Sequence, residues 1–197
     1  MSDLGKDKQL KEDTDGKKTP PALRAAKECA YLAVFVALLI AAQFVFSFLP
    51  GVEIVTVLFV GYAFVFGVKR GMLAATAFSL LRMLLFGFHP NVLVLYLLYY
   101  NGLTALFGCV RRWVKTGKEL RALWWIILLA CLCTVVFSML DNLITPLWYG
   151  FSARALKAYF FASFSVMLPQ VICTFFSVGL LFLPLQKTFV FIKKGLR

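Results

Sequence analysis

Long apolar stretches separated by short polar, glycine- or proline-containing breaks fill the chain from residue 22 onward. An α-helix needs about 20 apolar residues to cross the hydrocarbon core of a bilayer. Six stretches come near that length, so the pattern predicts an all-α membrane protein, a bundle of six transmembrane helices. The expected crossings are residues 26–48, 52–67, 72–86, 92–110, 123–144 and one within 156–185.

Glycine and proline mark the predicted ends of these helices. Pro50 and Gly51 should close the first crossing, residues 69–71 should form a loop, residues 87–90 should form the next turn, and Pro146 should stop the fifth crossing. The last apolar region is too long for one untilted crossing. Either Pro169 kinks one long tilted helix, or it opens the last helix and leaves residues 153–167 as an outer amphipathic segment.

Composition agrees with a lipid environment. The chain is 61% hydrophobic and only 15% charged, with a mean hydropathy of +0.85, whereas a soluble domain carries about 25% charged residues. Residues 1–21 differ from the rest, because they are rich in lysine, lack apolar periodicity and end in Pro20-Pro21. We predict that residues 1–21 are a disordered basic cytoplasmic tail and not a signal peptide, and that residues 22–197 form the substrate-binding membrane domain.

The basic residues predict the orientation, because Lys and Arg beside crossings mark the cytoplasmic side. With six crossings, 18 of the 21 basic residues fall on one side, in residues 6–27, 69–70, 111–121 and 187–197. The other side has only Arg154 and Lys157, and Arg82 lies inside a helix. Both termini are therefore predicted to be cytoplasmic, and the net charge of +12 needs no nucleic-acid partner.

A few polar residues fall at one depth, in the outer leaflet, although they come from four different elements. This arrangement is typical of a ligand pocket open to the exterior, whereas a through-pore would need polar residues along its full length. The candidate substrate-binding residues are Glu53, Arg82, His89, Asn91, Asp141 and Asn142.

Arg82 has a second interpretation. It could reach outward and pair with Glu53 or Asp141 as a structural tie, which is compatible with lining a pocket. Gln43 and Asn101 are more typical of hydrogen bonds between helices. The sequence gives no position for Gln170 relative to the others.

Small residues recur at spacings of three and four along the first predicted helix and form one continuous face. Such a face lets another helix approach closely in lipid. It serves either packing within this chain or docking of a separate subunit. The residues are Ala26, Ala30, Ala33, Ala37 and Ala41.

Several short segments in this order resemble one family, the substrate-binding S components of energy-coupling factor (ECF) importers, which belong to the ABC transport systems. The similar segments are the alanines at 33, 37 and 41, the run Leu-Pro-Gly-Val-Glu-Ile-Val-Thr at 49–56, the inner loop at 66–71 and the outer turn at 85–91. Together with the six predicted helices, the resemblance covers most of the chain after residue 22.

The resemblance implies capture of a vitamin or similar precursor at the outer face of the cell membrane. It further implies docking, through Ala33, Ala37 and Ala41, on a transmembrane T component bound to two ATPase subunits. The first predicted loop is very short for this family, so a lid would have to come from residues 148–157. The chain has no phosphate-binding Gly-x-x-x-x-Gly-Lys-Ser/Thr motif, so the energy would come from the partners.

Other functions fit the sequence less well. A membrane scaffold of the MreD type, in cell-wall morphogenesis, would have a similar bundle without a ligand. A solitary carrier or channel would have polar groups through its inner half. An enzyme would need convergent nucleophiles, bases or metal ligands. With one histidine and five scattered cysteines, we expect no metal site, no cofactor and no catalytic residue.

Overall fold

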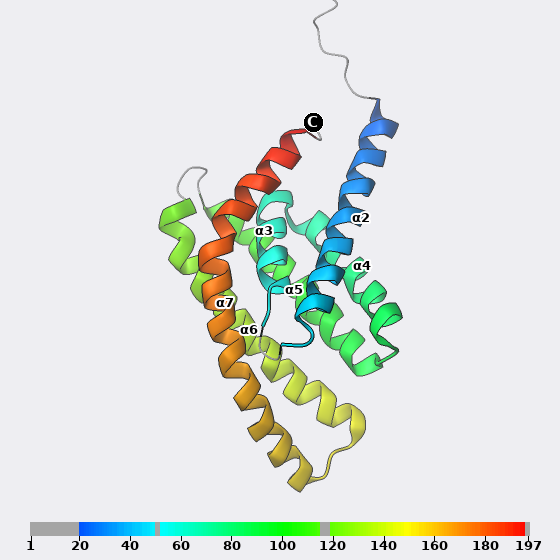
Figure 1. Ribbon diagram of the computed structural model, residues 1–197, viewed down its shortest axis with the longest axis vertical. Coiled ribbons are helices and arrows are strands. Elements are labelled where there is room, and N and C mark those ends of the chain that lie inside the picture. Colours follow the sequence, from blue (N-terminus) through cyan, green and yellow to red (C-terminus); the bar gives the residue numbers. More distant parts are fainter. Residues whose placement is uncertain (1–19, 50–51, 115–118, 196–197) are drawn as a thin grey trace, which may run out of the picture.

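The computed structural model describes residues 20–49, 52–114 and 119–195, and within these residues every regular element is a helix (Figure 1). The predicted helical bundle is confirmed. Its six helices are α2 (Pro21–Phe46), α3 (Val55–Phe66), α4 (Val68–Phe86), α5 (Pro90–Trp113), α6 (Glu119–Tyr149) and α7 (Ala153–Gly195).

Two of the predicted breaks differ from the structure, and the structure decides between the two alternatives at Pro169. Residues 69–71 are not a loop, because the turn is made by Gly67 alone, with a φ of 88°, and they already belong to the first turn of α4. Pro146 lies inside α6 and does not stop it. Pro169 and Pro184 lie inside α7, which is therefore one continuous helix and not a separate outer segment. Proline is tolerated within apolar helices where neighbouring groups satisfy the freed backbone.

The remaining predicted boundaries either agree closely with the structure or lie outside the described residues. Gly87, with a φ of 98°, ends α4 as predicted, and α5 begins at Pro90, two residues before the predicted crossing at 92–110. Residues 1–19 of the predicted tail and the predicted break at residues 50–51 lie outside the described residues, and Pro21 is already the first residue of α2.

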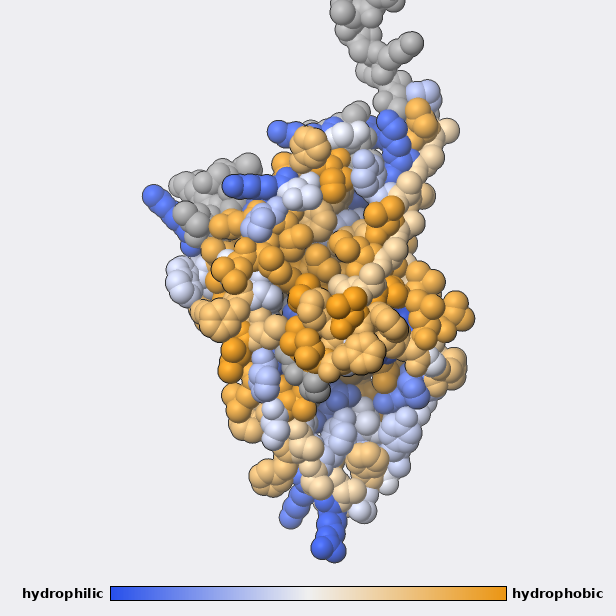
Figure 2. Space-filling model, in the orientation of Figure 1, coloured by the Kyte–Doolittle hydropathy of each residue, from blue (hydrophilic) through white to orange (hydrophobic). Residues whose placement is uncertain are grey.

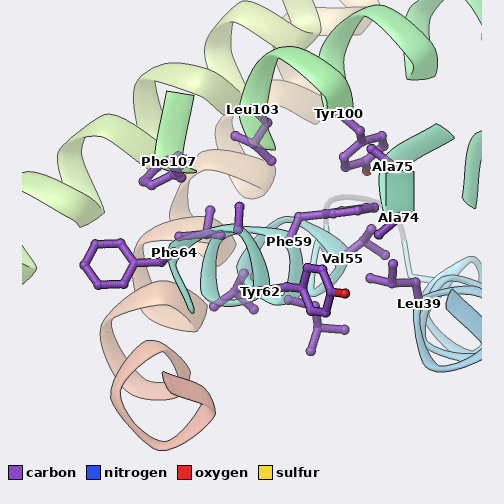
Figure 3. Close-up of a cluster of buried hydrophobic side chains, with 14 of the residues drawn as sticks. Leu39, Val55, Phe59, Tyr62, Phe64, Ala74, Ala75, Tyr100, Leu103 and Phe107 are labelled. Carbon is purple, nitrogen blue, oxygen red and sulfur yellow. The ribbon is translucent and has the colours of Figure 1, made fainter. Parts of the chain in front are cut away.

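The short helix α3 forms the centre of the bundle. All of its residues from 55 to 65 are buried, and it contacts each of the other five helices. A helix that is apolar all round is stable only when it is surrounded. Figure 3 shows Phe59, Tyr62 and Phe64 of α3 projecting from the helix, with Leu39 of α2 and Tyr100 of α5 in the same cluster.

Charged groups of suitable sign lie at both ends of α3. Its C-terminal carbonyl groups include that of Val65, which accepts hydrogen bonds from the Arg111 guanidinium and from Lys193 Nζ. The Glu53 carboxylate lies just before its N-terminus and accepts a hydrogen bond from Thr56 Oγ1 at 2.9 Å. Cations at the C-terminus and an anion at the N-terminus both match the helix dipole.

Within the described part of the chain, four helices are long and apolar enough to cross a membrane: α2, α5, α6 and α7. Figure 2 shows a broad hydrophobic band between more hydrophilic ends, which fits a multi-pass membrane protein. α3, with 12 residues, rises only about 18 Å, and α4 carries Lys69, Arg70 and Arg82.

The start of α2 and the end of α7 lie at the same end of the bundle, which we name the terminal end. At the opposite end, α6 and the first half of α7 form a hairpin that extends beyond the other helices (Figure 1). The 43 residues of α7 correspond to about 65 Å, so this helix runs the length of the molecule. The hairpin therefore extends past the N-terminal end of α3 and can contact a molecule bound there.

Candidate functional site

The segment before α3 carries the first acidic residue of the site. Residues 52–54 are not helical, and the Glu53 amide N–H points to Cys173 Sγ of α7 at 3.4 Å. The Glu53 carboxylate accepts a hydrogen bond from Thr56, and Glu53 lines a cavity together with Gln170 of α7. These contacts hold a half-buried carboxylate between α3 and α7, near the hairpin end of the core.

Arg82 of α4 lies against aromatic rings rather than against an acid. Its guanidinium carbon is 4.3 Å from the centroid of the Tyr96 ring and 5.3 Å from that of Phe86. Among the described residues no carboxylate lies within 4.0 Å of it, since the ion pairs found there join Glu28 to Arg24 and Arg70. The predicted tie between Arg82 and Glu53 or Asp141 is therefore not formed.

Two buried side-chain atoms at this position have no hydrogen-bond partner among the described residues. One is Arg82 Nε, and the other is Gln43 Oε1 of α2. Gln43 Nε2 donates to the Tyr96 hydroxyl at 3.0 Å, which joins α2 to α5. Buried polar atoms nearly always have partners, so these two atoms are available for a bound molecule or water.

A cavity of about 290 Å³ opens between these groups. It lies between the end of α2, the segment before α3, and the facing sides of α4 and α5. Its polar lining combines one guanidinium, one carboxylate, an amide and hydroxyl groups. The polar residues that line it are Gln43, Ser47, Glu53, Arg82, Tyr96 and Tyr100.

A second cavity of about 420 Å³ is lined mainly by residues of α6 and α7. Glu53 and Tyr96 line both cavities. The acid of the second cavity is Asp141 of α6. Its Oδ1 accepts a hydrogen bond from Thr145 at 2.8 Å, and its Oδ2 accepts one from the Tyr159 hydroxyl of α7 at 2.7 Å. The two cavities thus bring Glu53, Arg82 and Asp141 to one divided site.

The other three predicted site residues line neither cavity. His89 is exposed and precedes α5 as its N-cap residue. Asn91 is buried and structural, because its Nδ2 donates to Thr145 and its Oδ1 accepts from the Tyr149 hydroxyl. Asn142 is buried, and its Oδ1 has no hydrogen-bond partner among the described residues.

Several lining residues were not among the predicted site residues. Gln43 bridges helices, as its sequence context suggested, yet it also lines the first cavity. Gln170 and Tyr159 of α7 line the second, and Tyr96 separates the two. The signal was weak for each residue, because which face of a long apolar helix turns inward depends on its packing. Asn101 does bridge helices, through Thr76.

The alanine face of α2 is not buried by another helix of this chain. All five alanines of the stripe are exposed. Three of them, Ala33, Ala37 and Ala41, line an apolar groove of about 750 Å³ between α2 and α4. Of the two interpretations of the stripe, close internal packing is therefore not the one that the described residues adopt.

No protein-family model matches the chain, and comparisons with curated proteins and with solved structures also found no match. Within the described residues, no three His, Cys, Asp or Glu side chains come together as a possible metal site. The geometry of the two cavities is therefore the basis on which a function is inferred.

Proposed function

We propose that this protein is the substrate-capture subunit of an ECF-type importer, which binds a vitamin-like small molecule between α3 and the hairpin end of the bundle. One observation carries the proposal. Arg82 and Glu53, of opposite charge, line one cavity without forming an ion pair. Charges at membrane depth are costly and mark functional sites when they face the bundle interior. Concave sites of a few hundred Å³ with a few polar groups suit small organic ligands.

The backbone before α3 supports the same proposal. Non-helical backbone at membrane depth is tolerated only where it is buried in protein or lines a cavity. Residues 52–54 are non-helical, and all three line the cavity that holds Arg82. A bundle built only to present its surface to partners has no need of such an interruption.

In the proposed membrane arrangement there are six crossings, both termini are cytoplasmic, and the protein lies in the cell membrane. Basic groups at the terminal end support this orientation. Arg70 pairs with Glu28 at 2.6 Å, and Arg111 and Lys193 hold the end of α3. Because α3 is short and enclosed, it would count as a crossing only together with the non-helical segment that precedes it.

The exposed alanine face supports the proposed partners, a transmembrane T component carrying two ATPase subunits. Small side chains allow close helix approach in lipid, where packing rather than the hydrophobic effect drives association. The groove between α2 and α4 offers Ala33, Ala37 and Ala41 in one line. A helix of the T component would fill this groove.

The first experiment is purification of the tagged protein in mild detergent from its own cells, followed by native mass spectrometry. A retained vitamin-sized molecule together with a T component and ATPases is the expected result. Co-purification of cell-wall morphogenesis proteins without any small molecule would refute the importer and favour the scaffold of the MreD type.

A pair of tryptophan variants tests the docking face. In Ala37→Trp the new ring would occupy the groove, so we expect loss of the co-purifying T component with small-molecule binding unchanged. The matched control is Leu38→Trp, because Leu38 is 49% exposed on the same helix but does not line the groove. Equal recovery of the T component with both variants would remove the groove from the docking surface.

A further inference from the structure

The charged side chains that line the two cavities indicate which charges a ligand should carry. Within the described linings, the first cavity has one guanidinium, from Arg82, and the second has the carboxylate of Asp141. Glu53 belongs to both. The site thus offers two acidic groups against one basic group, and the basic group lies on one side only.

The hydrogen bonds within the protein leave some donor and acceptor positions of these charged side chains for a ligand. Asp141 accepts from Thr145 and Tyr159, and Glu53 accepts from Thr56. A carboxylate has about four acceptor positions, so each retains capacity for a donor on a ligand. Arg82 instead needs an acceptor on a ligand, because its buried Nε–H has no acceptor among the described residues.

Aromatic groups line both cavities. Tyr96 forms part of both cavities, and Phe137 lines the second cavity with its ring centroid 5.9 Å from that of Tyr96. Phe86 and Tyr100 line the first. Flat apolar faces of this kind favour a planar ring in the ligand.

Resting on the proposed function, we infer that the ligand is an amphoteric ring compound. Its protonated nitrogen lies between Glu53 and Asp141, and its carboxylate, phosphate or carbonyl oxygen accepts from Arg82. A ligand that is only an anion would satisfy Arg82 but would add negative charge beside two acidic groups. A neutral ligand would leave both acidic groups without a counter-charge in a site of low dielectric constant, so that they would either remain as unpaired charges or take up protons.

The test begins with the chemical identity of the small molecule that co-purifies with the full chain, read by mass spectrometry after extraction. We expect a basic nitrogen and an oxygen acceptor in one ring-bearing compound. A retained compound without a basic nitrogen would overturn this inference and leave the proposed function standing. Absence of any retained small molecule would overturn both.

Variants then test where the nitrogen binds, with the identified compound as the probe. Glu53→Gln and Asp141→Asn keep the side-chain shape and remove the charge, so each should weaken binding about 10- to 100-fold. Glu28→Gln is the matched control, since Glu28 pairs with Arg70 at the terminal end, and its affinity should stay within about two-fold of wild type. Unchanged affinity in both Glu53→Gln and Asp141→Asn would overturn the placement. Retained thermal stability of each variant would separate lost binding from lost folding.

Discussion

The close approach of α5 to the turn between α3 and α4 predicts that Gly108→Ala destabilises the bundle. A Cβ atom at Gly108 would lie 2.7 Å from the Val68 amide nitrogen, 2.7 Å from its Cγ2 and 3.0 Å from its Cα. Two of these three atoms belong to the backbone, so a side-chain rotation cannot relieve the clash. Val68 also follows the tight turn at Gly67, which leaves the backbone little room to shift.

The magnitude follows from comparison with a second glycine of the same helix. At Gly102 an added Cβ meets nothing within 4 Å, so Gly102→Ala should gain only the helix preference of alanine, about 0.5–1 kcal/mol. Gly108→Ala has the same gain but also the cost of overpacking, about 1–3 kcal/mol. The difference between the two variants isolates the clash, and we expect Gly108→Ala to be less stable than Gly102→Ala by about 1–3 kcal/mol.

The assay is unfolding by SDS in mixed micelles, followed by the fluorescence of the chain's 4 tryptophans. Both variants and the wild-type protein are measured under the same conditions. If Gly108→Ala proved as stable as Gly102→Ala, α5 would not approach Val68 as closely as described, and the central position of α3 would need another explanation.

Two further variants test contacts along α6 and α7. Tyr159→Phe removes the hydroxyl that donates to Asp141 at 2.7 Å, and we expect amide hydrogen exchange of residues 153–162 to become about 10-fold faster; unchanged exchange would show that this bond does not hold the hairpin. Thr134→Val removes the buried contact with Thr174 at 3.0 Å and should lower the unfolding free energy by about 0.6 kcal/mol. A double-mutant cycle with Thr174→Val measures the same coupling, and strict additivity of the two changes would contradict a direct interaction.

The sequence was a good guide where local chemistry decides the backbone. Gly87 ended one helix as predicted, and the next helix began at Pro90, within two residues of the predicted start, because a positive φ and a fixed proline φ act within a few residues. Pro146 was a poor guide. Whether a proline stops an apolar helix depends on which neighbours satisfy the freed carbonyl, and this is a tertiary property.

The candidate site was also predicted only in part. Helix boundaries and charge asymmetry sufficed to expect Glu53, Arg82 and Asp141 at one depth, and these three line the two cavities. Depth alone could not separate them from Asn91, which bonds α5 to α6. It also could not find Gln170, because the face that α7 turns toward α3 is set by packing between helices and not by the composition of α7.

The hairpin end gives the bundle an uneven local stability. From Gly150 to Ala162 every residue except Tyr159 is exposed, whereas α3 is buried along nearly its whole length. Segments with few packed neighbours open at a lower free energy than the core. Glu53 and Tyr96 lie on the well-packed side of the divided site, and Tyr159 and Ser163 lie on the sparsely packed side. A molecule held between them joins the most buried and the most exposed parts of the fold, so its binding is expected to raise the free energy of local opening of the hairpin.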